Sequence, residues 1–209
     1  SILSPAVFPP LARLASENKA RFKNLLESAI SFSFLVAIPL VVGGLIVGQD
    51  LIQILFGSEY IGGTPTFMVL LFTLLVVFPG SFVVYAVLAY DSQKVFLLYL
   101  GLGLVANIIL DLILIPPFGI IGSAFATVAA QILANFVIWR KLKSIQDFET
   151  LRHLWKMIAA SVGMGVLVLA LKLIGLPVLI TVALGAGAYL LFLYILKEPL
   201  LKYIPYVPH

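Results

Sequence analysis

Six long apolar stretches, separated by short polar or glycine- and proline-containing connections, dominate the pattern of hydrophobic and polar positions along the chain. A bilayer core about 30 Å thick needs about 20 apolar residues in a helix that rises about 1.5 Å per residue. Sustained alternation of polar and apolar positions, typical of membrane β-barrels, is absent from these stretches. The pattern therefore predicts an all-α polytopic membrane protein with full spans at residues 30–48, 66–90, 95–115, 119–139, 154–174 and 177–196.

The overall composition agrees with this pattern. The chain has 209 residues, of which 62% are hydrophobic and 11% are charged, and its mean hydropathy is +1.17. Ordinary soluble domains contain about 45–50% apolar residues, so this composition excludes them. Cysteine is absent, which excludes disulfides and thiolate metal sites from this chain. Because the N-terminal segment is already apolar, we expect residues 1–16 to be the tail of a preceding transmembrane helix.

The distribution of basic residues predicts the orientation. If the spans alternate across the membrane, all of the 13 Lys and Arg residues except Lys172 fall on one side, and Asp50 and Glu59 fall on the other. Cytoplasmic loops collect Lys and Arg, so we expect the basic side and both ends of the chain to be cytoplasmic. This asymmetry and contact with membrane lipids account for the net charge of +4. No nucleic-acid partner is expected.

The connections predict short elements and two hairpins. An interfacial helix at 17–29 leads into the first span, and a short outer helix at 50–56 ends at Gly57. The third span ends at Pro116-Pro117, directly before the fourth, so these two spans should pack as a tight antiparallel hairpin. Gly175-Leu176-Pro177 joins the last two spans in the same way.

Proline within two spans predicts bent helices. Pro39 lies in the first span, and Pro79 and Gly80 lie near the middle of the second. A proline removes one backbone hydrogen bond and clashes with the preceding turn, which bends the helix. A static kink is the common result in membrane helices, and a hinge at these three residues is the functional alternative.

Polar side chains recur every four residues along the third and fourth spans. Such spacing stacks them on one face of each helix, and unsatisfied polar groups are costly in hydrocarbon. We therefore expect both stripes to face protein or a wet cavity. The candidate residues are Asn107, Asp111, Ser123, Thr127, Gln131 and Asn135.

Asp111 is the single carboxylate within the predicted spans. An acid at the centre of a membrane helix costs about 2.5–3.5 kcal/mol by insertion scales. Two hypotheses account for it. Asp111 forms a hydrogen bond to Asn107 or to the stripe of the fourth span, or it takes up a proton or a cation on a transport pathway.

Residues suited to catalysis or to metal binding are few. The histidines His153 and His209 have no metal-ligand neighbour at helical spacing. Asp50 and Glu59 have no basic or aromatic cluster around them. We therefore predict that the protein is not an enzyme and has no catalytic residue, metal or cofactor.

Three motifs, taken in order, resemble the C-terminal part of polysaccharide biosynthesis flippases, within the superfamily of multidrug, oligosaccharidyl-lipid and polysaccharide exporters. They are P-x-x-x-P-P-L-A-R-L from Pro5 to Leu14, I-x-I-L-F-G-S-E-Y from Ile52 to Tyr60, and N-x-x-L-D-L-x-L-I-P-x-x-G-x-x-G-S-A-x-A-T from Asn107 to Thr127. The resemblance covers most of residues 1–140. The last two spans match that family only in number and position.

The resemblance implies a fold and a function. Such proteins typically have twelve or fourteen helices in two lobes, so residues 17–140 would supply helices of the C-terminal lobe. Residues 141–209 would add a charged cytoplasmic loop, an additional helix pair and a cytoplasmic tail. The implied function is translocation of a lipid-linked oligosaccharide or polysaccharide precursor across the cytoplasmic membrane by alternating access. The implied partners are this lipid-linked glycan and a missing N-terminal lobe, which would carry most residues that grip a diphosphate.

Two alternatives remain at this point, a drug/cation antiporter of the same superfamily and a membrane-embedded glycan-transferring enzyme. Inward-facing acids in the missing half would favour the antiporter. The enzyme would need an acidic or histidine-containing catalytic loop, which we do not find in the sequence. The flippase pattern commonly has Asn at the position of Asp111, and an amide cannot carry a proton, which favours the hydrogen-bond hypothesis for this residue.

Overall fold

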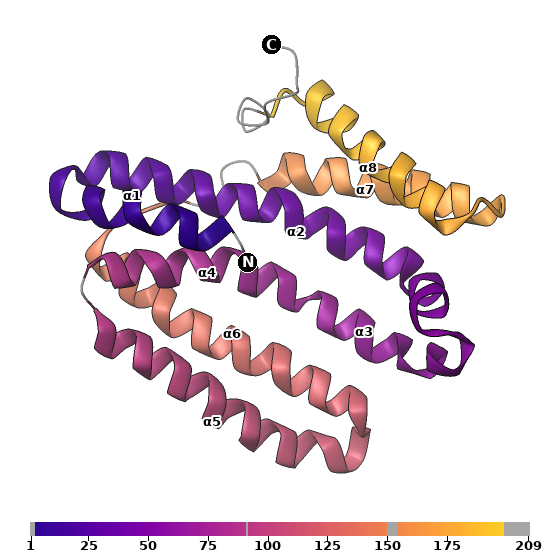
Figure 1. Cartoon of the computed structure of the whole chain (residues 1–209), viewed down its shortest axis with the longest axis horizontal. Coiled ribbons are helices and arrows are strands. Elements are labelled where there is room, and N and C mark those ends of the chain that lie inside the picture. The colour runs from indigo at the N-terminus through magenta and orange to yellow at the C-terminus, as the bar shows by residue number, and fades with distance from the viewer. Residues whose placement is uncertain (1–2, 91, 150–153, 199–209) are drawn as a thin grey trace.

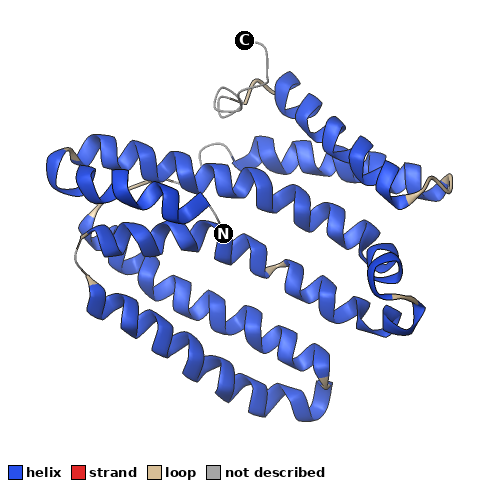
Figure 2. Ribbon diagram, viewed as in Figure 1, coloured by secondary structure: helices blue, strands red, loops and turns tan. Residues whose placement is uncertain are grey.

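The computed structural model describes residues 3–90, 92–149 and 154–198, with only the backbone for residues 3–7. This part of the chain is helical with short connections and contains no strand (Figure 2). Its elements are α1 (Leu3–Glu17), α2 (Lys19–Phe56), the 3₁₀ helix η1 (Ser58–Gly63), α3 (Thr64–Leu71), α4 (Thr73–Ala89), α5 (Gln93–Phe118), α6 (Ile120–Ile145), α7 (Leu154–Leu173) and α8 (Val178–Ile195) (Figure 1).

The all-α class and the six predicted spans are confirmed. Within the described residues, six helical segments are long and apolar enough to cross a bilayer. Each coincides with one predicted span, although the ends differ by several residues. The segments are Lys19–Phe56, Ser58–Ala89, Gln93–Phe118, Ile120–Ile145, Leu154–Leu173 and Val178–Ile195.

Helix α2 is the central element. The α7–α8 hairpin packs on one side of α2, whereas α4 packs on the other side, with α6 and then α5 beyond it (Figure 1). One buried cluster joins α1, α2, α4 and α6 around Phe22 and Ile138. A second cluster joins α2 to α7 and α8 around Leu35, Met164 and Leu193. Helix α2 therefore connects two hydrophobic cores that otherwise use different helices.

The continuity of α2 corrects the prediction of an interfacial helix at 17–29 and a separate outer helix at 50–56. These segments and the first span form one helix of 38 residues. Asn18 caps its start by accepting a hydrogen bond from the Arg21 N–H at 3.0 Å, and Gly57, with a φ of 99°, ends it as predicted. The hydropathy of a segment reflects its depth in the membrane, but a helix ends only where turn-forming residues interrupt it. The prediction of separate helices at 17–29 and 50–56 was therefore wrong.

Proline positions and helix ends also differ from the prediction. Pro116-Pro117 lies inside α5, which ends at Phe118, with Gly119 at a φ of 59°. The fixed φ of proline suits a helix, and the last carbonyls of a helix lack donors in any case, so α5 tolerates both prolines near its end. The second span is interrupted at Phe72, between α3 and α4, and continues helically through Pro79 and Gly80.

Both predicted hairpins are present. Helices α5 and α6 pack against each other more extensively than any other pair, and α7 and α8 turn at Gly175, which has a φ of 80°. Helix α6 extends to Ile145, so the predicted cytoplasmic connection at 140–153 begins as helix. His153 and the end of the predicted tail, residues 199–209 with His209, lie outside the described residues.

Candidate functional site

The polar stripes of α5 and α6 meet at the interface of their hairpin. Asn107 donates from Nδ2 to Oγ1 of Thr127 at 3.5 Å, a long hydrogen bond between the two helices. Gly122 permits the close approach, because an added Cβ would overlap the Leu114 carbonyl oxygen. Helices that approach so closely can bring short polar side chains into contact.

A groove of about 280 Å³ runs along this interface. Its lining mixes polar side chains with small and aliphatic ones along an otherwise apolar hairpin. None of the residues of α5 is buried in the described structure, so the groove lies at an edge of the bundle (Figure 1). The lining residues are Tyr99, Leu100, Gly103, Leu104, Asn107, Thr127, Ala130, Gln131 and Ala134.

Asp111 lies one helical turn beyond Asn107 and is half-buried. Its Oδ1 is buried and has no hydrogen-bond partner among the described residues. The hydrogen bond that the sequence suggested for Asp111 is therefore not made by this oxygen. A buried carboxylate oxygen without a hydrogen-bond donor is costly at membrane depth. Asp111 therefore needs a proton, a cation or a donor to compensate this oxygen.

Gln131 and Asn135 lie one and two helical turns beyond Thr127 on α6. The Nδ2 of Asn135 donates to the Gln131 carbonyl at 2.9 Å, within the same helix. Gly80 of α4 lies directly against the Asn135 amide, because a Cβ at Gly80 would overlap Oδ1. Asn135 thus belongs to the contact between α6 and α4, and Ser123 is half-buried near the turn between α5 and α6. The part of these six residues in function stays a prediction.

The predicted hinge residues have ordinary helical surroundings. Pro39 lies in α2, and Pro79 and Gly80 lie in α4, where both residues are buried. The close contact with Asn135 gives Gly80 a packing role that the sequence did not reveal. Motion at these positions stays a prediction.

A second groove, which sequence reasoning missed, is lined by residues of α2, α3, α4, α7 and α8. It has a volume of about 540 Å³ and is lined almost entirely by apolar atoms. The Tyr189 hydroxyl at its edge donates to the Leu35 carbonyl at 2.8 Å and ties α8 to α2. Gly43, Gly44 and Gly185 in its lining were the available signal, since small residues permit close or hollow packing.

Chemistry that makes or breaks bonds has little support in these helices. Among the described residues, no group of three or more His, Asp and Glu side chains is placed to hold a metal ion. The polar residues that do come together are the amide of Asn107 and the hydroxyl of Thr127, and Asp111 lies one helical turn from Asn107.

Comparison with known proteins decides the family. The model of the family "Lipid II flippase MurJ" matches residues 2–197. The chain belongs to the MurJ family. The predicted resemblance to lipid-linked glycan flippases is thereby confirmed, and this MurJ-family chain is a multi-pass membrane protein.

Relatives of this MurJ-family chain include one curated protein named as a probable flippase and one named for capsular polysaccharide biosynthesis. "Probable flippase AglR" of Haloferax volcanii is 28% identical over 194 residues, which is 89% of this chain and 40% of the relative. "Capsular polysaccharide biosynthesis protein CapF" of Staphylococcus aureus is 26% identical over 133 residues, which is 63% of this chain and 34% of the relative. The chain therefore spans well under half the length of these proteins.

A solved structure shares the MurJ-family fold. "Lipid II flippase MurJ, inward closed conformation" superposes with a TM-score of 0.78 at 22% sequence identity, over 95% of this chain and 43% of that one. This similarity establishes the arrangement of the helices. It also means that the described helices correspond to less than half of a MurJ molecule.

Proposed function

We propose that this chain is the C-terminal part of a flippase that moves a lipid-linked oligosaccharide or polysaccharide precursor across the cytoplasmic membrane. The observation that carries the proposal is the family match along residues 2–197, together with relatives named for flipping or for glycan biosynthesis. Translocation changes the position of the substrate and breaks no bond, so the proposal requires no catalytic residue in this chain. An N-terminal lobe, absent from this chain, would complete the pathway and alternate with this half.

The proposed orientation places both ends of the chain in the cytoplasm. Its main support is the charge distribution, since Lys172 is the single basic residue predicted on the opposite side. The fold agrees, because Lys172 pairs with Asp50 at one end of the bundle, whereas the α1–α2 turn and the end of α6 lie at the other (Figure 1).

The apolar groove beside α2 suits the hydrocarbon tail of a lipid carrier. Its lining offers almost no polar atom, so it would bind an alkyl or isoprenoid chain by contact area alone. The glycan and its phosphate groups would remain outside it. In this assignment the tail lies against α2 and α8 while the polar part crosses between the lobes.

Asp111 is proposed to take up a proton or a coupling cation during transport. Its buried Oδ1 without a partner supports this assignment, because a proton or a cation supplies the missing compensation. Asn107 lies one turn from Asp111 on α5 and contacts Thr127 of α6, so both side chains could form hydrogen bonds to the same solute. The rival hypothesis, a purely structural hydrogen bond, predicts that an amide at this position serves equally well.

Deletion of the complete gene in its host tests the transport proposal. We expect loss of a surface glycan and accumulation of its lipid-linked precursor in the inner leaflet, both reversed by the full-length gene. Unchanged precursor distribution in the deletion strain would contradict the proposal.

A further inference from the structure

A hollow of about 520 Å³ lies beside the turn between α1 and α2, and none of its lining residues lines the two grooves described above. Two arginines and three apolar residues line it. The apolar part comes from Pro9, Pro10 and Leu14, and the charged part comes from Arg13 and Arg21. The hollow is therefore amphipathic, with two guanidinium groups next to a hydrocarbon surface.

The turn that carries the two arginines has a defined geometry. The Asn18 N–H donates to the Leu14 carbonyl at 2.9 Å, and Asn18 Oδ1 accepts from the Arg21 N–H at 3.0 Å. The neighbouring Phe22 is fully buried, and its ring lies 5.0 Å from the ring of Tyr90. Arg21, one residue before Phe22, is exposed and lines the hollow.

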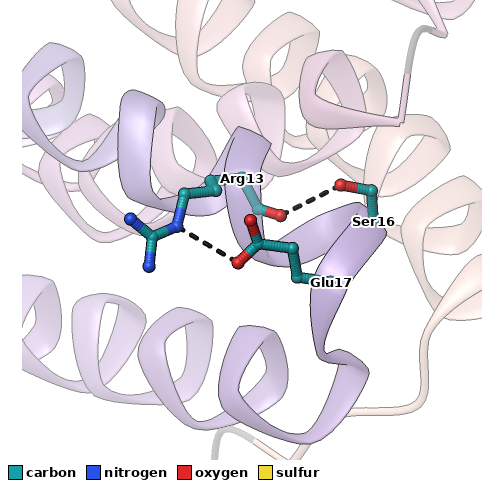
Figure 3. Close-up of polar contacts among 3 residues, drawn as sticks. All are labelled: Arg13, Ser16 and Glu17. Atoms are coloured by element: carbon teal, nitrogen blue, oxygen red, sulfur yellow. Dashed lines mark hydrogen bonds and ion pairs between the residues drawn. The ribbon is translucent and has the colours of Figure 1, made fainter.

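Arg13 is partly neutralised but keeps free donors. Its Nε donates to Glu17 Oε2 at 3.1 Å, and the terminal nitrogens of the guanidinium point away from Glu17 (Figure 3). Ser16 holds the same turn of α1 by donating to the Arg13 carbonyl at 3.1 Å. The Arg13 side chain remains 75% exposed, so the terminal nitrogens are open to a ligand.

Arg21 violates a general rule of helix electrostatics. The first turn of a helix carries a partial positive charge and favours acidic side chains. The first turn of α2 contains no acid, whereas Lys19 and Arg21 lie at its start. Arg21 has no ion pair within the described residues. Glu17, the acid nearest to this turn, is paired with Arg13, so a bound anion would relieve the remaining positive charge.

We propose that this hollow binds the phosphate of an anionic phospholipid headgroup in the inner leaflet. The terminal nitrogens of Arg13 and the guanidinium of Arg21 donate to the phosphate oxygens, in the fork geometry that suits Arg and phosphate. Pro9, Pro10 and Leu14 contact the glycerol and the first acyl carbons. The assignment depends on the proposed cytoplasmic orientation of the α1–α2 turn and not on which substrate is flipped.

Native mass spectrometry of the full-length protein tests the site. The protein is titrated with phosphatidylglycerol or phosphatidylcholine, as wild type, as R13Q/R21Q and as K94Q/K141Q. Lys94 and Lys141 are exposed, lie on the same predicted side of the membrane and do not line the hollow. The K94Q/K141Q control therefore removes the same amount of positive charge as R13Q/R21Q, but away from the site. Because all four side chains are exposed, both double variants should fold, and an unchanged unfolding temperature checks this.

We expect one phosphatidylglycerol to bind wild type and K94Q/K141Q at least about tenfold more tightly than it binds R13Q/R21Q, since two charge-assisted bonds are lost. Phosphatidylcholine, whose choline cation cancels the phosphate charge, should show a smaller difference among the three proteins. Equal weakening in both double variants would overturn the site in favour of diffuse surface charge. A polyprenyl diphosphate that displaces phosphatidylglycerol at equimolar concentration would overturn the assignment to a phospholipid. Transport of the glycan is measured separately, so its failure is distinguishable from failure of this site.

Discussion

Lys172 Nζ lies 2.6 Å from Asp50 Oδ2 and 2.8 Å from the Ile46 carbonyl oxygen. This contact joins the end of α7 to α2. Lys172 is the one basic residue that the charge pattern assigns to the outer side, and Asp50 is one of the few acids there. The pair thus neutralises an otherwise unfavourable cation and fixes the α7–α8 hairpin on α2.

Disrupting this pair should loosen the hairpin. The two side chains are about one third exposed, so we expect a coupling free energy of about 1 kcal/mol in a cycle of K172Q, D50N and the double variant. Thermal unfolding of the full-length protein in detergent measures it. The matched control is the exposed pair of Arg13 and Glu17, for which the same cycle should give no more than about 0.5 kcal/mol. Additive effects of K172Q and D50N would contradict the structural role of the pair.

Substitution of Gly80 should disturb the contact between α4 and α6. A methyl group at Gly80 overlaps the Asn135 amide, so G80A should destabilise the protein by about 1–3 kcal/mol, as overpacked cores do. Gly101 provides the control, because a Cβ there meets nothing within 4 Å. G101A should be neutral or slightly stabilising, since alanine favours the helix. A G80A protein that is as stable as G101A would contradict the tight packing of Gly80 against Asn135.

The Tyr189 hydroxyl should contribute to the attachment of α8. Tyr189 is buried, and its bond to the Leu35 carbonyl spans two helices, so Y189F should cost about 1 kcal/mol in unfolding. Tyr194, on the same helix and 58% exposed, offers a matched substitution. Y194F should leave the unfolding temperature unchanged. Equal effects of the two substitutions would argue against a specific role for the interhelical bond.

The substitution D111N distinguishes the two hypotheses for Asp111, which are binding of a proton or a cation and a structural hydrogen bond. If Asp111 binds a proton or a cation, D111N should abolish the dependence of transport on pH or on the coupling ion while the protein remains folded. D147N, at an exposed position, should behave as wild type. A D111N protein that keeps both transport and its pH and ion dependence would contradict proton or cation binding and favour a structural role for Asp111.

Much of this architecture could be predicted from the sequence because single features determine it. Runs of apolar residues set the spans, and short glycine- and proline-containing connections set the two hairpins. The four-residue spacing that includes Asn107 and Thr127 placed both stripes on facing sides of α5 and α6.

Other features depend on contacts between distant segments and could not be predicted. The apolar groove forms only when the α7–α8 hairpin docks on α2, and the partner of Asn135 is Gly80 on another helix. The pairing of Lys172 with Asp50 likewise needs both helix ends in register. The length of α2 was missed because hydropathy carries no information about helix continuity across the membrane surface.

Reconstitution of the full-length protein tests the proposed transport most directly. Liposomes would contain a fluorescent lipid-linked oligosaccharide, a membrane-impermeant reductant would bleach the label exposed outside, and pH, ion and voltage gradients would be imposed in turn. We expect the protected inner-leaflet label to become accessible only with active protein, while a fluorescent phospholipid without a glycan stays protected. Protection of the glycan-linked label equal to that in protein-free liposomes under every gradient would contradict the flippase function.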